Sequence, residues 1–351
     1  MAKANVLVTA VGGRSVGSGI LHALLRCGDQ TLSRWNLFAA DANSFSWGLY
    51  MVENHFLLPM ANEPHYLEYL LEMVKKHNIH AILPGSEVEV DLLSQHVQSF
   101  ANTQIICNDN KLMPLMMDKL FMYTRLNELG ISTIPTYPLK EWQTLLSRFG
   151  FPLIIKPYRG TGGSRGVDIL LNQSDLNNYL AENNTNYCLQ PYLGTEDDEY
   201  TVGVLTDKEG LIIDSIVMKR KLLGLSLLKE KKQEAQKIII SSGYSQGYII
   251  KDKEIQNFCE DLALKLQSKG PLNIQLRKHK GEVFVFEVHP RFSGTTPIRA
   301  SVGFNEVDIL LQNFIYNKKF GRIPYQYNVA AIRAFEHKIV PIETLSSLTL
   351  S

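Results

Sequence analysis

The feature that most constrains the fold is a regular alternation of apolar runs and amphipathic segments in the first hundred residues. Continuous apolar runs are typical of strands that are buried on both faces of a parallel sheet. Between the runs, apolar residues recur at helical spacing in residues 20–25 and 66–76. This alternation predicts a Rossmann-like parallel sheet that binds ligands at the carboxyl ends of its strands. The strands are expected at residues 6–11, 37–40, 81–83 and 104–107.

The rest of the chain has a different pattern of apolar residues and glycines. A helix is expected at 116–129, where Gly130 follows as a left-handed cap. From residue 151 onward, short apolar strands alternate with glycine turns, which predicts an antiparallel α+β region that includes an amphipathic helix at 258–266. Residues 273–276 and 283–288 are expected to form a hairpin or neighbouring strands. The predicted divisions are a first domain at 1–110, further units at 111–190 and 191–337, and a tail at 338–351.

Length and charge limit the classes of protein that fit. The chain has 351 residues, which is too long for one ordinary core and predicts two or three domains. Its 36 Lys and Arg residues nearly cancel 35 Asp and Glu residues, so no overall field favours nucleic acid or a membrane. Any anionic ligand must therefore be held by local groups.

The cysteines and the N-terminus favour a cytoplasmic protein. The four cysteines are widely separated and form no CxxC motif, which argues against a zinc site or a disulfide framework. The first apolar stretch is short and is broken by Gly12, Gly13 and Arg14, so we expect a strand rather than a signal peptide. No run reaches the roughly 18 apolar residues of a membrane span. The cysteines, expected as reduced and mostly buried thiols, are Cys27, Cys107, Cys188 and Cys259.

A glycine-rich segment at 158–166 follows the strand that is predicted to end at Lys156. Glycines allow backbone N–H groups to approach phosphate oxygens closely. Lys156 adds a positive point charge at the end of the strand. The segment alone is compatible with a phosphate-binding loop or with an ordinary glycine-rich hairpin turn.

Two pairs of polar residues lie on the later strands, Asn273 with Gln275 and Glu287 with His289. Residues two apart in a strand share a face, so each pair can point at one site. A carboxylate with amide or imidazole ligands suits a divalent cation that carries nucleotide phosphates. The alternative is a polar strand face that is satisfied by its neighbours.

Together these features resemble the ATP-grasp superfamily, and within it the synthetase halves of the carbamoyl-phosphate synthase large chain. The resemblance covers residues 3–320 in the family's order. It implies an α/β, Rossmann-like pre-ATP-grasp domain followed by a two-part ATP-grasp domain of α+β character, with nucleotide clamped between the two parts. The motifs that carry it are Lys156-Pro157-Tyr158-Arg159-Gly160-Thr161-Gly162-Gly163 and Glu287-Val288-His289-Pro290-Arg291.

The resemblance implies ATP contacts on both sides of the nucleotide. Lys119 matches a basic position that reaches a phosphate, and Lys156 matches the strand-end base at the α-phosphate. Residues 159–166 match the flap that closes over the phosphates, and 190–193 match the hinge whose backbone reads the adenine edge. Glu199 matches the acid that hydrogen-bonds the ribose, with Glu196 and Asp198 as alternatives. The remaining implied contacts are Gly160, Thr161, Gly162, Gly163, Gln190, Tyr192 and Leu193.

The resemblance also implies the metal and reaction sites. Gln275 and Glu287 match two metal-ligand positions, and Glu287 would bridge two magnesium ions. The resemblance implies Mg²⁺ as the metal. His289 stands where the family usually has Asn, and imidazole favours softer ions, so the alternatives are Mn²⁺, weaker metal binding or lost turnover. Arg291 matches the arginine that steadies the transferred phosphoryl group and, with Lys156, forms the implied catalytic pair. The candidate substrate contacts in the following segment are Ser293 and Arg299.

Three weaker patterns have competing interpretations. Glycines at 12–19, with Asp41 later in the chain, imitate a dinucleotide fingerprint, but a tight strand–helix turn explains them better. Residues 85–87 lie where an acceptor substrate would approach, although the favoured interpretation is that Ser86 caps a helix. The basic runs at 219–221 and 229–232 are expected on a solvated face, with Arg220 also able to reach a phosphate.

The function implied by the resemblance is an ADP-forming ligase that activates a carboxylate as an acyl-phosphate and couples it to an amine. The chain holds a single such unit, so it is not expected to be a carbamoyl-phosphate synthase itself. The expected partners are a small-molecule carboxylate and amine, without nucleic acid or membrane, and a homodimer is compatible with the sequence. The alternatives are a nucleotide-binding regulatory protein without turnover and a nicotinamide-dependent oxidoreductase.

Overall fold

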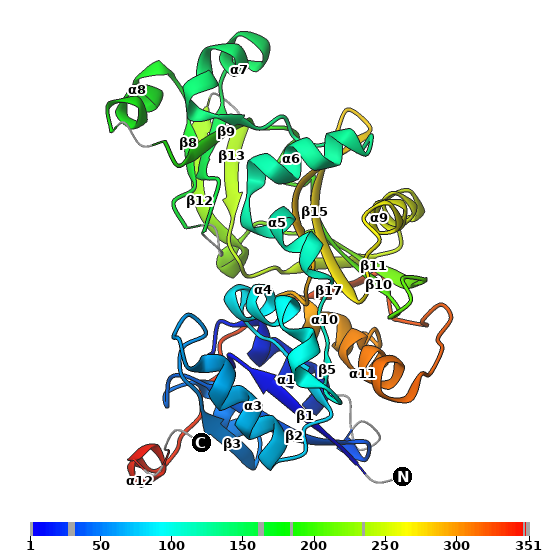
Figure 1. Ribbon diagram of the computed structural model, residues 1–351. Helices are drawn as coiled ribbons and strands as arrows, with labels where there is room; N and C mark the ends of the chain where they lie inside the picture. The colour runs from blue at the N-terminus through cyan, green and yellow to red at the C-terminus, as the bar shows by residue number, and fades with distance from the viewer. Residues whose placement is uncertain are drawn as a thin grey trace.

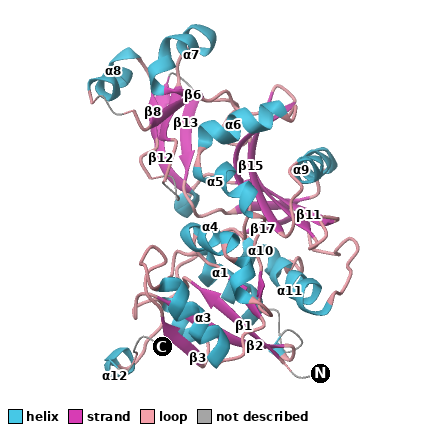
Figure 2. Ribbon diagram, in the orientation of Figure 1, coloured by secondary structure: helices cyan, strands magenta, loops and turns pink. Residues whose placement is uncertain are grey.

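The computed structural model describes residues 3–26, 32–160, 165–182, 185–233, 236–346 and 348. Predictions that fall on Cys27, Thr161, Gly162 and Gly163 therefore lie outside the described residues. The elements form a lower domain and two upper units (Figure 1, Figure 2). Within the described part of the chain, no helix combines the length and apolar character needed to cross a membrane.

The lower domain is the predicted Rossmann-like unit. Its five strands are parallel in the order β3-β2-β1-β4-β5. The expected strands are confirmed, whereas β3 was missed because its four residues at the sheet edge are only partly buried and form no continuous apolar run. The elements are β1 (Ala4–Thr9), α1 (Val16–Arg26), β2 (Trp35–Asp41), β3 (Asn54–Leu57), α3 (Tyr66–Lys76), β4 (Ala81–Leu83), α4 (Glu87–Gln95) and β5 (Gln104–Ile105).

Two glycines bring the loops after β1 and β4 into close contact at the carboxyl edge of this sheet. A Cβ atom on Gly85 would lie 2.1 Å from the Thr9 carbonyl oxygen and 2.6 Å from the Cα of Gly17. A Cβ atom on Gly17 would lie 2.3 Å from the same Thr9 oxygen. These distances are too short for any side chain, so close packing of the start of α1 against the loop after β4 explains these glycines without a nicotinamide ligand.

The helix predicted at 116–129 is two helices, α5 (Met113–Met117) and α6 (Lys119–Glu128). Asp118 separates them because its backbone is extended and its side chain accepts hydrogen bonds from the amides of Leu120 and Phe121. This is the geometry of an N-cap, which ends one helix and starts the next. Gly130 has the positive φ of 69° expected after the second helix.

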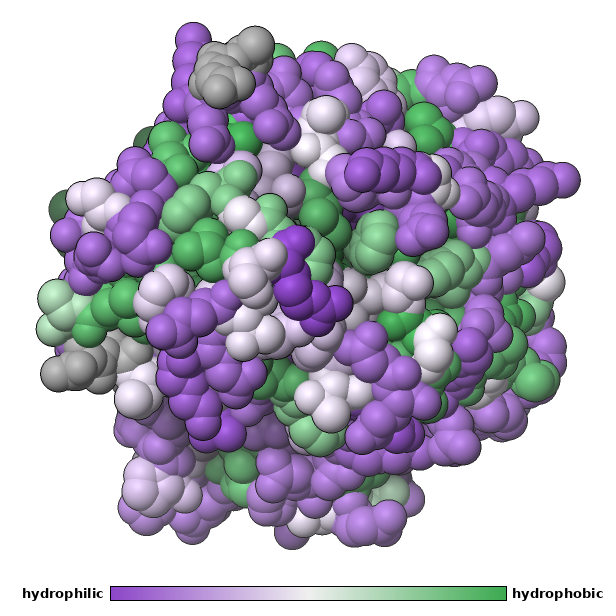
Figure 3. Space-filling view, turned by 90° about the horizontal axis from the view of Figure 1, so that it is seen from above, coloured by the Kyte–Doolittle hydropathy of each residue, from purple (hydrophilic) through white to green (hydrophobic). Residues whose placement is uncertain are grey.

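The first upper unit is a four-stranded sheet in the order β6-β9-β7-β8. A separate hairpin, β12–β13, packs on it through Ile238 and Ile240, which share a small apolar cluster with Ile169. The elements are β6 (Tyr137–Pro138), α7 (Trp142–Phe149), β7 (Leu153–Pro157), β8 (Asp168–Leu170), α8 (Gln173–Ala181), β9 (Tyr187–Pro191), β12 (Leu227–Gln233) and β13 (Gln236–Ser241). Seen from above, this end of the molecule is largely hydrophilic with smaller hydrophobic patches between (Figure 3).

The second upper unit is a six-stranded antiparallel sheet in the order β16-β15-β10-β11-β14-β17. The expected pairing of 273–276 with 283–288 is confirmed by the antiparallel register of β15 and β16. Helix α9 (Lys253–Lys265) packs against β10 and β11. The strands are β10 (Glu199–Thr206), β11 (Ile212–Arg220), β14 (Gly247–Ile250), β15 (Pro271–His279), β16 (Glu282–His289) and β17 (Val329–Ala331).

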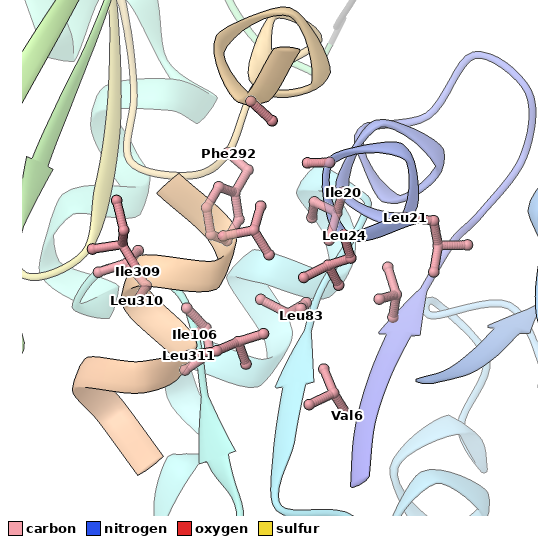
Figure 4. Packing of buried hydrophobic residues seen from close by; sticks show 14 of the residues in the cluster. Val6, Ile20, Leu21, Leu24, Leu83, Ile106, Phe292, Ile309, Leu310 and Leu311 are labelled. Atoms are coloured by element: carbon pink, nitrogen blue, oxygen red, sulfur yellow. The ribbon is translucent and has the colours of Figure 1, made fainter. Parts of the chain in front are cut away.

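The segment after β16 returns to the lower domain and joins its core. Helices α10 (Thr296–Ser301) and α11 (Glu306–Tyr316) pack against α1. Ile20 and Leu24 of α1 share one apolar cluster with Phe292 and Leu310 (Figure 4). This packing fixes the loop between β16 and α10 over the carboxyl edge of the parallel sheet. The chain then runs through β17 to α12 (Ile342–Ser346) beside the lower domain.

Candidate active site

A cavity of about 550 Å³ lies where the three units meet. The lower domain contributes the loops after β1 and β4 to its wall. The upper units contribute β7, β9, β13 and the faces of β10, β15 and β16. The loop between β16 and α10 forms a further part of the wall. Nearly all the predicted site residues that the structure describes line it, namely Lys119, Lys156, Gly160, Gln190, Tyr192, Leu193, Glu199, Gln275, Glu287, His289, Arg291 and Ser293.

Lys156 brings a buried cation to the cavity from β7. The residue is 5% exposed, and no ion pair or hydrogen bond holds its ammonium group within the described part of the chain. Burial lowers the pKa of Lys156, while the Glu287 carboxylate opposes that shift. Lys119 is tied to the same region because its backbone amide donates to the carbonyl oxygen of Tyr158 at 2.9 Å. The two lysines therefore flank one space that suits an anion.

The two predicted strand pairs face each other across the β15–β16 hairpin, where Gln275 is opposite Glu287 and Asn273 is opposite His289. The Gln275 amide nitrogen lies 3.1 Å from Glu287 Oε2, and His289 Nε2 lies 3.0 Å from the same oxygen. Burial pushes the pKa of Glu287 upward, but the hydrogen bond and charge of His289, with the Lys156 charge, hold it well below its usual range. Glu287 is therefore an anion surrounded by donors.

The side chains around Glu287 are also candidate ligands for a metal ion. His289 Nδ1 is buried without a hydrogen-bond partner, so this ring has a nitrogen available. Within the described ranges, no three His, Cys, Asp or Glu side chains gather as a metal site. Magnesium fits such a sparse set, because it is usually held by one or two carboxylates together with waters and substrate phosphates. Glu287, Gln275 and His289 therefore fit a cation that arrives with a nucleotide.

Arg291 reaches across to the lower domain. Its Nη2 atom lies 2.5 Å from Oε1 of Glu87, which is 204 positions away in the sequence. Burial pushes the pKa of Glu87 upward, but the charges of Arg291 and His289 outweigh burial and hold it below its usual value. The favoured interpretation of residues 85–87 is confirmed, because Ser86 caps α4 with Glu89 in a capping box, and Glu87 also lines the cavity.

Glu199 is enclosed by two arginines in the wall of the cavity. Its Oε1 atom lies 2.8 Å from Arg220 Nη1, and its Oε2 atom lies 2.9 Å from Arg277 Nη2. The guanidinium of Arg277 also lies 4.4 Å from the Tyr192 ring centroid and donates to the Leu193 carbonyl oxygen at 3.0 Å. Arg277 was missed in the sequence, although it shares a strand face with Gln275 two positions earlier.

Two predictions need correction. Arg220 does not lie on a solvated face, because it is 2% exposed and pairs with Glu199. Arg299 does not line the cavity, although it was predicted to contact substrate. Its guanidinium is buried between Asn273, at 2.6 Å, and Glu306, at 3.1 Å. Helix α10 directs the Arg299 side chain into the protein. A buried guanidinium without partners would be costly in free energy, which explains why Arg299 pairs with these internal groups.

We expect Glu199→Ala to destabilise the protein, because it leaves the two buried guanidinium groups beside each other without their carboxylate. Breaking a buried ion pair costs about 3–5 kcal/mol. Chemical denaturation should therefore show a loss of about 3 kcal/mol or more in the free energy of unfolding. Glu128→Ala is the control, because its pair with Arg125 is exposed and should cost less than about 1 kcal/mol. Equal losses in both variants would contradict the buried arrangement.

Comparison with known families agrees with this architecture. Residues 6–107 match the family model described as the PylC-like N-terminal domain. Residues 184–336 match the model described as ATP-grasp in the biosynthetic pathway with Ter operon. This match identifies residues 184–336 as an ATP-grasp domain. The predicted α/β first domain followed by a two-part α+β unit is confirmed by the five-stranded parallel sheet, the four-stranded and six-stranded sheets and the β12–β13 hairpin.

The curated relatives of the chain are distant in sequence. The carbamoyl phosphate synthase large chain of Methanosarcina barkeri is 27% identical over 256 residues, which is 69% of this chain and 23% of that protein. The chain thus spans about a quarter of the length of that relative.

Two solved structures show the same fold. The biotin carboxylase domain of Hydrogenobacter thermophilus 2-oxoglutarate carboxylase, in complex with MgADP, ADP and bicarbonate, has a TM-score of 0.64 at 17% identity. The match covers 92% of this chain and 72% of that one. The L-amino acid ligase from Bacillus licheniformis has a TM-score of 0.61 at 15% identity, covering 89% and 74%.

Proposed function

We propose that the chain is an ADP-forming ligase that activates a carboxylate with ATP and couples the resulting acyl-phosphate to an amine. The observation that carries the proposal is the charge of the cavity that Lys156, Glu287 and Arg291 line together. Seven Lys or Arg residues line it against three Glu residues, whereas the whole chain has a net charge of only +1. A local excess of cations in a partly buried cavity favours a polyanionic ligand such as ATP.

The proposed reaction has two steps. A carboxylate oxygen attacks the γ-phosphorus of ATP, which gives an acyl-phosphate and ADP. The amine nitrogen then attacks the acyl carbon, and the bond to phosphate breaks. Positioning and charge neutralisation supply most of the catalysis in such phosphoryl transfers. Lys119 and Lys156 would neutralise nucleotide phosphates, and Arg291 would hold the transferred phosphoryl group.

The cofactors of the proposal are ATP and a divalent cation. Gln275, Glu287 and His289 would hold Mg²⁺, or Mn²⁺ as an alternative, and the ion would neutralise the phosphate oxygens when bound. The hinge at Gln190, Tyr192 and Leu193 would receive the adenine, and Glu199 would face the ribose. The loop that contains Gly160 would cover the phosphates, and Ser293 would contact the second substrate.

The proposed setting is the cytoplasm. Cys107, Cys188 and Cys259 are buried free thiols, which is the state expected in a reducing compartment. Assembly as a homodimer is a further part of this proposal, which analytical ultracentrifugation would test.

The decisive experiment is a phosphate-release screen. The chain would be incubated with ATP and Mg²⁺ or Mn²⁺ against arrays of carboxylates, with amines or hydroxylamine as nucleophile. The proposal requires phosphate release that depends on a carboxylate, and hydroxylamine should trap the acyl-phosphate as a hydroxamate. ATP binding without release for any pair would instead support a regulatory nucleotide-binding protein.

His289→Asn separates these two functions. In the ligase, this substitution would replace a ring nitrogen of the proposed metal site by an amide oxygen, which suits Mg²⁺ better. We therefore expect the rate supported by Mg²⁺ to stay within about twofold of the parent or to rise, while the preference for Mn²⁺ falls. Steady-state rates with each ion would show this. Complete loss of activity would mean that the imidazole has a role beyond metal binding.

A further inference from the structure

Glu87 places an acid of the lower domain next to the proposed reaction centre. It is the first residue of α4, directly after the N-cap Ser86. Its carboxylate lies 2.5 Å from Arg291 and 3.9 Å from His289 Nδ1, and its side chain is 27% exposed. The acid therefore projects from the carboxyl edge of the parallel sheet into the cavity that the ATP-grasp residues line.

The fold does not need Glu87 to hold its own loop. The capping of α4 is done by Ser86 and Glu89, and Glu89 also accepts a hydrogen bond from Tyr66 at 2.8 Å. Among the described residues, the ion-pair partners of Glu87 are Arg291 and His289, and Oε2 of Glu87 accepts no hydrogen bond. Glu87 thus has one strong partner and one free carboxylate oxygen.

The balance of charges around the Glu87 carboxylate during the proposed reaction indicates its function. In the proposed reaction, Arg291 turns to the phosphoryl group, and Glu87 then loses its strong cationic partner. The partly buried carboxylate then keeps only the weaker contact with His289, at 3.9 Å, so binding of another cation in place of Arg291 becomes favourable. A carboxylate or an alcohol cannot do this, whereas a protonated amine can.

We propose that Glu87 is the binding group for the acceptor substrate, which arrives as an ammonium ion, and that the Glu87 carboxylate accepts the proton that this nitrogen must lose before it attacks the acyl carbon. The inference rests on the proposed ligase function and deepens it by naming the acceptor as a cationic amine rather than bicarbonate or a neutral alcohol. Ser15, Ser86 and Thr295, which line the same cavity, make its wall polar. Because Arg291 covers Glu87 until phosphoryl is bound, the amine binds after ATP and the carboxylate.

The test compares a charged and an uncharged nucleophile on the same acyl-phosphate. Hydroxylamine is uncharged near neutral pH, whereas the amino acids, methylamine and ethanolamine carry an ammonium group. The rate with the best of these amines would be divided by the rate of hydroxamate formation, for the parent chain and for Glu87→Gln, Glu87→Asp and Glu68→Gln. Glu68 is the matched control because it is an exposed acid on α3, paired only with the exposed His65 within the described residues.

We expect Glu87→Gln to lower this ratio about 100-fold, because removing one partner of a buried charge pair weakens binding by about that factor. Glu87→Asp should restore the ratio to within about tenfold, and Glu68→Gln should leave it unchanged. Thermal melts of each variant would confirm that the fold is retained.

Each other outcome has a definite meaning. Equal changes of both rates in Glu87→Gln would show that the acid only pairs with Arg291, which overturns the inference but not the ligase function. Hydroxamate formation by a parent chain that couples none of the amines would also overturn the inference alone. A parent chain that forms neither hydroxamate nor amide overturns the proposed function, and the inference falls with it.

Discussion

Lys156→Met should weaken ATP binding about 100-fold. The substitution keeps most of the buried aliphatic length of the side chain but removes the ammonium group that faces the cavity. Because no internal carboxylate is hydrogen-bonded to that group within the described residues, its charge is available to a phosphate. Removing one partner of a desolvated charge pair costs about 2–5 kcal/mol, and each 1.4 kcal/mol is tenfold in affinity. Titration calorimetry with ATP and Mg²⁺ would measure the loss.

The matched control is Lys140→Met. Lys140 is an exposed lysine of the same unit, in the short 3₁₀ helix Leu139–Glu141. This variant should bind ATP as the parent does, which separates a local effect from a general loss of positive charge. The prediction fails if Lys156→Met binds ATP within about threefold of the parent. A nicotinamide-binding protein would also behave differently, because its cofactor would bind at the lower domain and tolerate this substitution.

Glu287→Gln should abolish turnover while leaving nucleotide binding measurable. The amide keeps the shape of the carboxylate, and Gln275 and His289 still have an oxygen to contact. The negative charge that would hold the metal against the phosphates is lost. Losing one preorganised electrostatic group of this kind typically lowers the catalytic rate about 10²–10³-fold. We expect that loss in phosphate release, with ATP affinity lowered less than about tenfold.

Glu282→Gln provides the comparison for this result. Glu282 lies at the start of the same strand, β16, and is exposed to solvent. Its replacement should change neither the phosphate-release rate nor the affinity for ATP. If Glu287→Gln keeps more than about a tenth of the parent rate, the proposed metal site is wrong, and the cavity binds nucleotide by another arrangement.

Local sequence patterns were enough to predict several parts of this structure. Continuous apolar runs predicted the parallel sheet, because both faces of its strands are covered. The two-residue spacing of Glu287 and His289 predicted their common face, because side chains in a strand alternate strictly between faces. The helix at 116–129 was wrong at Asp118, where capping of the following amides competes with continuation of the helix.

The sequence by itself therefore determined the class of fold, the order of the units and the placement of Lys156 and Glu287, because these depend on periodicity along the chain. Only the tertiary structure decided which distant groups meet. It joined Glu87 to Arg291, enclosed Glu199 between Arg220 and Arg277, and buried Arg299 against Asn273. The reason is physical. Partners far apart in sequence are selected by packing and by the cost of leaving a buried charge unpaired, and neither leaves a local signal in the chain.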